Sequence, residues 1–73
     1  MLEPSAFNRQ LGINIRVARQ AAGLRACELA AAIGVSRSTM TRIEQGARGL
    51  GINRLRWAAA ALGVSEASLL PPL

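Results

Sequence analysis

Glycines divide this chain into segments of helical length, and their spacing restricts the fold more than any other feature. Gly23, Gly34, Gly46 and Gly63 each follow a run in which apolar residues recur three or four positions apart. Glycine often ends a helix, because it adopts a left-handed backbone at little cost. No stretch alternates with the two-residue period of a strand. The spacing therefore predicts an all-α fold with short connections between its helices.

We expect five helices in a compact bundle that forms one domain over residues 1–73. The first helix follows Ser5, whose hydroxyl suits a helix cap. Its apolar stripe consists of Phe7, Leu11, Ile15, Ala18 and Ala22. The other helices are expected at about Arg25–Ile33, Ser36–Gln45, Ile52–Leu62 and Glu66–Leu70. Residues 1–5 are predicted as a short flexible arm, and residues 71–73 as a tail, because two prolines stop the last helix.

The composition excludes several kinds of chemistry. The chain has no histidine and a single cysteine, Cys27, so the sequence predicts neither a disulfide nor a zinc site. Cys27 is expected to be exposed, opposite the buried face of the second helix. The chain also lacks aspartate, and no base accompanies the thiol, so we expect neither an enzyme nor a cofactor or small-molecule site.

The ends and the apolar runs give no sign of a membrane protein. The first residues lack the basic and apolar segments of a signal peptide. The longest apolar run, Trp57–Leu62, is far too short to cross a bilayer. The sequence therefore predicts a cytoplasmic protein without a membrane partner.

The charge is strongly positive. Nine arginines stand against four glutamates, which gives a formal net charge of +5 on 7.7 kDa. Such a chain produces a field that attracts polyanions. Nucleic acid, an anionic membrane surface and an acidic protein are all compatible with the charge alone.

The junction between the second and third helices has the pattern of a tight corner. Ala30 is small enough for another helix to approach, and Gly34 can take the positive φ of a sharp turn. The positions that such a corner buries are apolar: Leu29, Ile33, Val35, Met40 and Ile43. The opposite face of the third helix carries no acid and consists of Ser36, Arg37, Ser38, Thr41, Arg42 and Gln45. A helix with these two faces suits the major groove of DNA.

The stretch from Leu24 to Gly46 resembles the helix-turn-helix of the Xre family, the type of the Cro and cI repressors. The similarity is carried by Leu29-Ala30, by Ile33-Gly34-Val35-Ser36-Arg37-Ser38-Thr39 and by Arg42-Ile43-Glu44-Gln45-Gly46. It continues on both sides, from Leu11 to Ser65, and so covers most of the chain. The resemblance implies a lambda-repressor-like bundle, with a helix-turn-helix at about residues 25–45, that binds double-stranded DNA as a homodimer.

The resemblance also implies roles for single residues. Arg48 matches a loop position that touches backbone phosphates or reaches toward the minor groove. Arg19 and Glu44 match a pair that joins the first helix to the end of the third. Base-reading and nearby phosphate-contacting positions are matched by Ser36, Arg37, Ser38 and Arg42, and more variable neighbours by Thr41 and Gln45.

The sequence departs from the family pattern at two places. Members commonly have a glutamine that binds a phosphate at the start of the second helix, where this chain has Ala26. Alanine has no side-chain donor, so Arg25 is the candidate to replace that contact. The proline and the N-cap that often precede the fourth helix are Leu50 and Gly51 here, which predicts a less rigid start for this helix.

Trp57 is the residue of the fourth helix that packing does not explain. This helix is expected to bury Ile52, Leu55, Ala59 and Leu62, and Trp57 lies roughly opposite that stripe. An exposed tryptophan predicts a partner contact, the alternative being burial beneath the N-terminal arm. We expect a homodimer contact formed by Trp57, Leu69 and Leu70 and extended along the tail to Leu73.

Three functions are compatible with these residues. The first is a sequence-specific DNA-binding transcriptional regulator, acting as a repressor on a palindromic operator. The second is an antitoxin-type protein that also binds DNA and in addition neutralises a toxin. The third is a protein-interaction module with this fold but without affinity for DNA. The acid-free face of the third helix favours the first.

Overall fold

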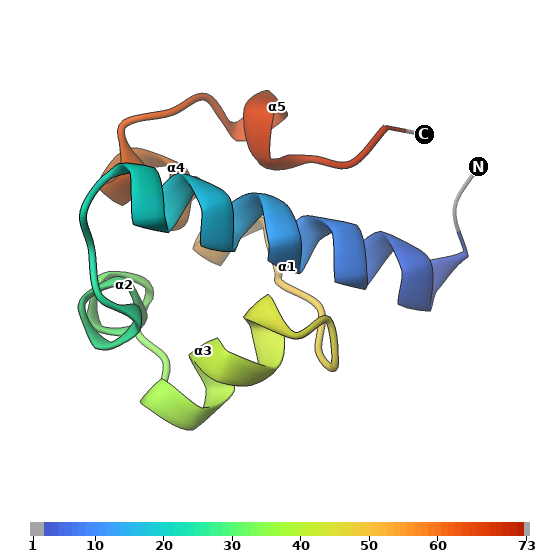
Figure 1. Cartoon of the computed structure of the whole chain (residues 1–73), viewed down its shortest axis with the longest axis horizontal. Helices are drawn as coiled ribbons and strands as arrows, with labels where there is room; N and C mark the ends of the chain where they lie inside the picture. Colours follow the sequence, from blue (N-terminus) through green and yellow to red (C-terminus); the bar gives the residue numbers. More distant parts are fainter. Residues whose placement is uncertain (1–2, 73) are drawn as a thin grey trace.

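The computed structural model describes residues 3–72, and every regular element within them is a helix (Figure 1). The helices in chain order are α1 (Pro4–Ala21), α2 (Ala26–Ile33), α3 (Arg37–Glu44), α4 (Ile52–Leu62) and α5 (Glu66–Leu69). The predicted all-α fold with five helices is confirmed. None of these helices has the length and apolar character needed to cross a membrane.

The glycines that mark helix ends in the sequence have the expected backbone. Gly23, Gly34, Gly46 and Gly63 all have positive φ, between 70° and 77°. At Gly34 this conformation turns the chain from α2 into α3, and the next amide, that of Val35, donates to the carbonyl of Ala30 at 3.0 Å. The bend of the helix-turn-helix therefore follows from one glycine and the bonds on either side of it.

The first helix begins earlier than the sequence predicts. Pro4 is its first residue and Glu3 its N-cap, so residues 4 and 5 belong to a helix and not to a flexible arm. Proline is favourable at this position because its missing amide hydrogen would have no partner there. Ser5 donates its hydroxyl to the Glu3 carboxylate instead of capping the helix. At the other end, Ala22 is an exposed C-cap and not part of the buried stripe.

One core joins all five helices. α1 packs against α3 and α5, α2 packs against α3 and α4, and α4 also contacts α5. The buried apolar residues are Leu11, Ile15, Leu29, Ala30, Ile33, Met40, Ile43, Leu55, Ala58, Ala59, Leu62 and Leu69. The corner residues that the sequence predicts as buried all lie in this cluster or pack against it, Val35 being the partly exposed one.

Three positions at the end of the chain differ from expectation. Ile52 is 60% exposed, because the buried side of α4 begins only at Leu55, and Ala58 is buried although the sequence stripe did not include it. Leu69, predicted at a dimer contact, is only 1% exposed and belongs to the core. Pro71 is buried, so the segment directly after α5 still packs against the protein and is not a free tail. Leu73 lies outside the described residues.

Candidate nucleic-acid interface

Helix α3 separates its residues sharply by face. Met40 and Ile43 are buried, which anchors one side of the helix to the bundle. The predicted DNA-contacting residues Ser36, Arg37, Ser38, Thr41, Arg42 and Gln45 are all exposed, and so is Arg48 in the following loop. Helical spacing places Arg37, Ser38, Thr41 and Arg42 on the side of α3 away from Met40 and Ile43, with Ser36 and Gln45 at its two ends.

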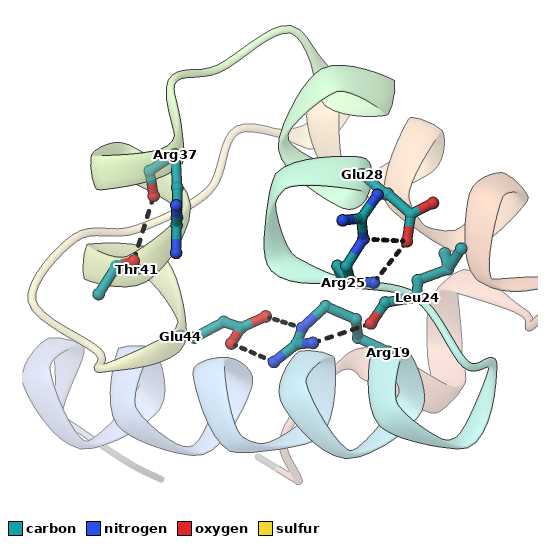
Figure 2. A network of polar contacts seen from close by, with 7 residues as sticks. All are labelled: Arg19, Leu24, Arg25, Glu28, Arg37, Thr41 and Glu44. Atoms are coloured by element: carbon teal, nitrogen blue, oxygen red, sulfur yellow. Dashed lines mark hydrogen bonds and ion pairs between the residues drawn. The ribbon is translucent and has the colours of Figure 1, made fainter.

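The start of α3 is fixed by its own side chains. Ser36 is the N-cap, and its Oγ accepts a hydrogen bond of 3.1 Å from the Thr39 amide. The Ser36 hydroxyl also donates to the Thr39 hydroxyl at 2.9 Å. One turn later, the Thr41 hydroxyl donates to the Arg37 carbonyl at 3.1 Å (Figure 2). These bonds hold the exposed face in a defined shape while the guanidinium of Arg37 stays free of them.

Arg19 and Glu44 form the ion pair that joins α1 to the end of α3 (Figure 2). The Arg19 Nε donates to Glu44 Oε2 at 2.7 Å, and Nη2 donates to Oε1 at 3.1 Å, so the contact is bidentate. The third donor, Nη1, binds the Leu24 carbonyl at 2.9 Å. Both side chains are nearly covered, with 13% and 10% of their surface exposed.

This pair also affects the charge of the exposed face of α3. Donation to the Glu44 carboxylate raises the pKa of Arg19, and burial opposes that effect only in part. Glu44 is the one acidic residue of α3, and it points toward α1 (Figure 2). With that carboxylate neutralised, the exposed side of α3 is purely cationic and hydroxylic.

A helical glycine lets α1 approach the backbone of α3. A Cβ atom at Gly12 would lie 2.5 Å from the Ile43 carbonyl oxygen and 2.6 Å from that of Glu44. No residue other than glycine fits there without moving one helix. The sequence carried a signal for this contact that composition and periodicity missed. Glycine within a helix costs about 1 kcal/mol relative to alanine, so its presence indicates a close approach.

The start of α2 is held by Arg25 and Glu28. Glu28 Oε1 accepts a hydrogen bond of 2.8 Å from the Arg25 amide and a longer one of 3.4 Å from its Nε (Figure 2). The bond from the backbone amide lowers the pKa of Glu28, and the Arg25 side chain lowers it further. The Arg25 side chain remains 78% exposed, so it can reach a phosphate while its backbone amide donates to Glu28.

The remaining arginines show where positive charge is unbalanced. Within residues 3–72 the ion pairs are Arg19–Glu44, Arg25–Glu28 and Arg56–Glu66. The six other arginines make no ion pair in this part of the chain: Arg9, Arg16, Arg37, Arg42, Arg48 and Arg54. Arg54 instead donates from Nε to the Ile33 carbonyl at 3.2 Å, which ties α4 to the end of α2.

The surface of α4 differs in kind from that of α3. Trp57 is 52% exposed, which excludes its burial beneath the N-terminal segment. Ala60 and Ala61 are also exposed and follow it at three and four positions, so they lie along one side of the helix. We refer to these three residues as the Trp57 face. Leu70 is exposed as well, beyond α5. The described residues contain no cluster of acidic, cysteine or histidine side chains that could hold a metal ion.

Comparison with known proteins gives the same fold and family. Residues 10–70 match the family model described as a helix-turn-helix domain. The clp gene regulator ClgR of Corynebacterium glutamicum superimposes with a TM-score of 0.80 and 30% sequence identity, over 86% of this chain and 82% of that one. The restriction-modification controller protein C.AhdI of Aeromonas hydrophila superimposes with a TM-score of 0.82 and 29% sequence identity, over 89% of this chain and 98% of that one.

A third similar structure is the DNA-binding domain of BldD, with a TM-score of 0.78 and 28% identity over 92% of this chain and 97% of that one. No curated protein sequence is significantly similar. These neighbours agree with the resemblance to Xre-type helix-turn-helix regulators that the sequence shows.

Proposed function

Since this chain belongs to the family of helix-turn-helix domains, we propose that it is a sequence-specific transcriptional regulator that binds double-stranded DNA as a dimer. The observation that carries the proposal is the exposed face of α3, which has no acid and two arginines that make no ion pair within residues 3–72. Its width and its donors suit the major groove, where arginine recognises guanine through two hydrogen bonds. By occupying a palindromic operator in the cytoplasm, such a dimer would act as a repressor.

The proposed contacts divide into two kinds. Arg37, Ser38 and Arg42 lie on the helix that enters the groove, so we assign base edges to them, with Thr41 and Gln45 beside them. Ser36 at the helix start and Arg48 in the next loop are assigned to phosphates, because helix N-termini and loop arginines suit anions. Arg25, exposed at the start of α2, is assigned to a phosphate on the other side of the groove that receives α3.

A dimer is proposed because one helix of this size reads too few base pairs to single out one site. Two copies related by a twofold axis would place their recognition helices about 34–36 Å apart, one turn of DNA. The Trp57 face supports this arrangement. It is apolar, its alanines permit close packing of a second helix, and it belongs to α4 and not to the helix-turn-helix.

Selection of bound sequences from random duplex DNA tests the proposal. We expect enrichment of a palindrome whose half-sites lie one helical turn apart. Arg37→Ala and Arg42→Ala should each relax the sequence preference at defined base pairs. Arg48→Ala should instead weaken binding to all sequences alike and flatten the slope of log affinity against log salt concentration by about 0.9. Enrichment of no sequence, or unchanged preferences in both α3 variants, would contradict the assignment.

The dimer has its own test. Trp57→Ala should reduce cooperative binding to the palindrome while the thermal unfolding of the protein stays unchanged, because the indole is half exposed. Binding to an isolated half-site is the control and should not change. A variant that binds the palindrome as cooperatively as the parent would remove Trp57 from the dimer contact.

A further inference from the structure

The first turns of α1 lie directly against the loop that follows α3. A Cβ atom at Gly46 would lie 2.5 Å from the Arg9 Cα and 2.7 Å from its Cγ. A Cβ atom at Gly49 would lie 3.3 Å from the Asn8 Oδ1. Arg9 and Asn8 thus cover the loop at Gly46 and Gly49. This contact places the stem of Arg9 beside the segment that carries Arg48.

Arg9 is free to bind a ligand at this position. It is exposed, and within residues 3–72 it makes neither an ion pair nor a side-chain hydrogen bond. Glu44, the acid nearest to this loop along the chain, is already bound by two donors of Arg19. The positive charge of Arg9 therefore adds to that of Arg42 and Arg48 at the same end of the recognition helix.

We infer that Arg9 binds a DNA backbone phosphate, so that α1 extends the interface beyond the helix-turn-helix; this inference rests on the proposed function. The groove that receives α3 is bordered by phosphates, and the loop after α3 leaves the helix toward one of these borders. α1 itself does not enter the groove, so Arg9 positions the protein and reads no base.

Salt titrations of Arg9→Gln and Arg56→Gln on the same duplexes test this inference. Each substitution removes one positive charge, but Arg56 pairs with Glu66 between α4 and α5. We expect Arg9→Gln to weaken binding about tenfold at low salt and to flatten the log–log salt slope by about 0.9. The loss should be equal on the selected palindrome and on random duplex. Arg56→Gln should retain the affinity of the parent, and Arg9→Lys should recover most of the loss.

Each other outcome has a defined meaning. Equal losses for Arg9→Gln and Arg56→Gln would show an effect of net charge alone and would overturn the inference, with DNA binding intact. A loss confined to one sequence would overturn the phosphate assignment. If the parent protein binds no duplex at any salt concentration, the proposed function itself fails. Both variants should unfold at the temperature of the parent, since neither side chain is buried.

Discussion

The two sides of α1 are packed in opposite ways. α3 lies on one side of this helix and α5 on the other (Figure 1). Toward α3, Gly12 lies against the backbone carbonyls of Ile43 and Glu44, and Arg19 donates two hydrogen bonds to Glu44. Toward α5, the Asn14 side chain donates one hydrogen bond of 3.0 Å to the Leu69 carbonyl. The Gln10 side-chain amide in turn donates to Asn14 Oδ1 at 2.9 Å.

Beside that bond, the α1–α5 junction contains an open groove of about 310 Å³. It is lined by Asn14, Val17, Ala18, Ser68 and Leu69. A contact without spare volume fixes the position of the element that it holds, whereas a groove allows adjustment. From this difference we expect the position of α3 to be defined more closely than that of α5. The proposed reading of base edges by α3 requires such a fixed position, because hydrogen bonds to bases depend on distance and angle.

The largest effect is expected where the packing is closest. Gly12→Ala places a Cβ atom 2.5 Å from the Ile43 carbonyl oxygen, so α1 and α3 must separate. Such overpacking costs about 1–3 kcal/mol or more, while alanine gains about 1 kcal/mol in helix propensity. Because the contact is with backbone on both sides, we expect the steric cost to prevail, with a net loss of about 2 kcal/mol in urea unfolding.

Gly23→Ala is the matched control for that substitution. Gly23 has a φ of 72° and no atom near its missing side chain, so alanine there meets backbone strain without a steric clash. We expect a loss of about 1 kcal/mol. The DNA-binding readout should separate the two variants further, since only Gly12→Ala displaces α3. Equal unfolding midpoints and equal affinities would mean that α1 and α3 do have room to adjust.

The ion pair on the same side should come second in size. In a double-mutant cycle of Arg19→Met and Glu44→Gln, we expect a coupling of about 1.5 kcal/mol, within the range of about 0.5–3 kcal/mol found for residues in contact. The two side chains are mostly covered, so their coupling free energy should exceed that of an exposed salt bridge, which is below about 1 kcal/mol. Additive single effects, measured by urea unfolding, would reduce this contact to an ordinary surface pair.

The sequence predicted the features that one segment determines by itself. The helix ends at Gly34 and Gly63, the cap at Ser36 and the exposed face of α3 all follow from local periodicity and residue type. The predicted start of α1 was wrong, and the reason is again local. Pro4 suits the first helical position better than Ser5 suits the N-cap.

Contacts between distant segments were predicted only where the family resemblance supplied them. The resemblance paired Arg19 with Glu44, but the approach of Gly12 to Ile43 depends on how two helices cross, which periodicity does not encode. Leu69 shows the same limit. A leucine near the end of a short chain is compatible with a partner contact or with the core, and only the path of the chain after α4 decides between them.

On the looser side of α1, a lost bond should have a smaller effect. Asn14→Ala removes the hydrogen bond to the Leu69 carbonyl, whose loss we expect to cost about 1 kcal/mol in urea unfolding. Hydrogen exchange should show faster opening of α5, with α2 and α3 protected as in the parent. DNA affinity should not change. A loss of affinity equal to that of Gly12→Ala would contradict the separation between the two sides.

The smallest effect is expected for added volume in the groove. Ala18→Leu places three more carbon atoms on α1 at a position that lines a space of about 310 Å³, so no backbone needs to move. Leucine and alanine both favour a helix, and the new methyl groups would cover part of the exposed Val17. We expect a change in unfolding free energy of less than about 0.5 kcal/mol, in either direction. Gly12→Ala adds a single carbon on the opposite side of the same helix and should cost several times more. If Ala18→Leu were the more damaging of the two in urea unfolding, the groove would be closed in solution, and both sides of α1 would be equally tight.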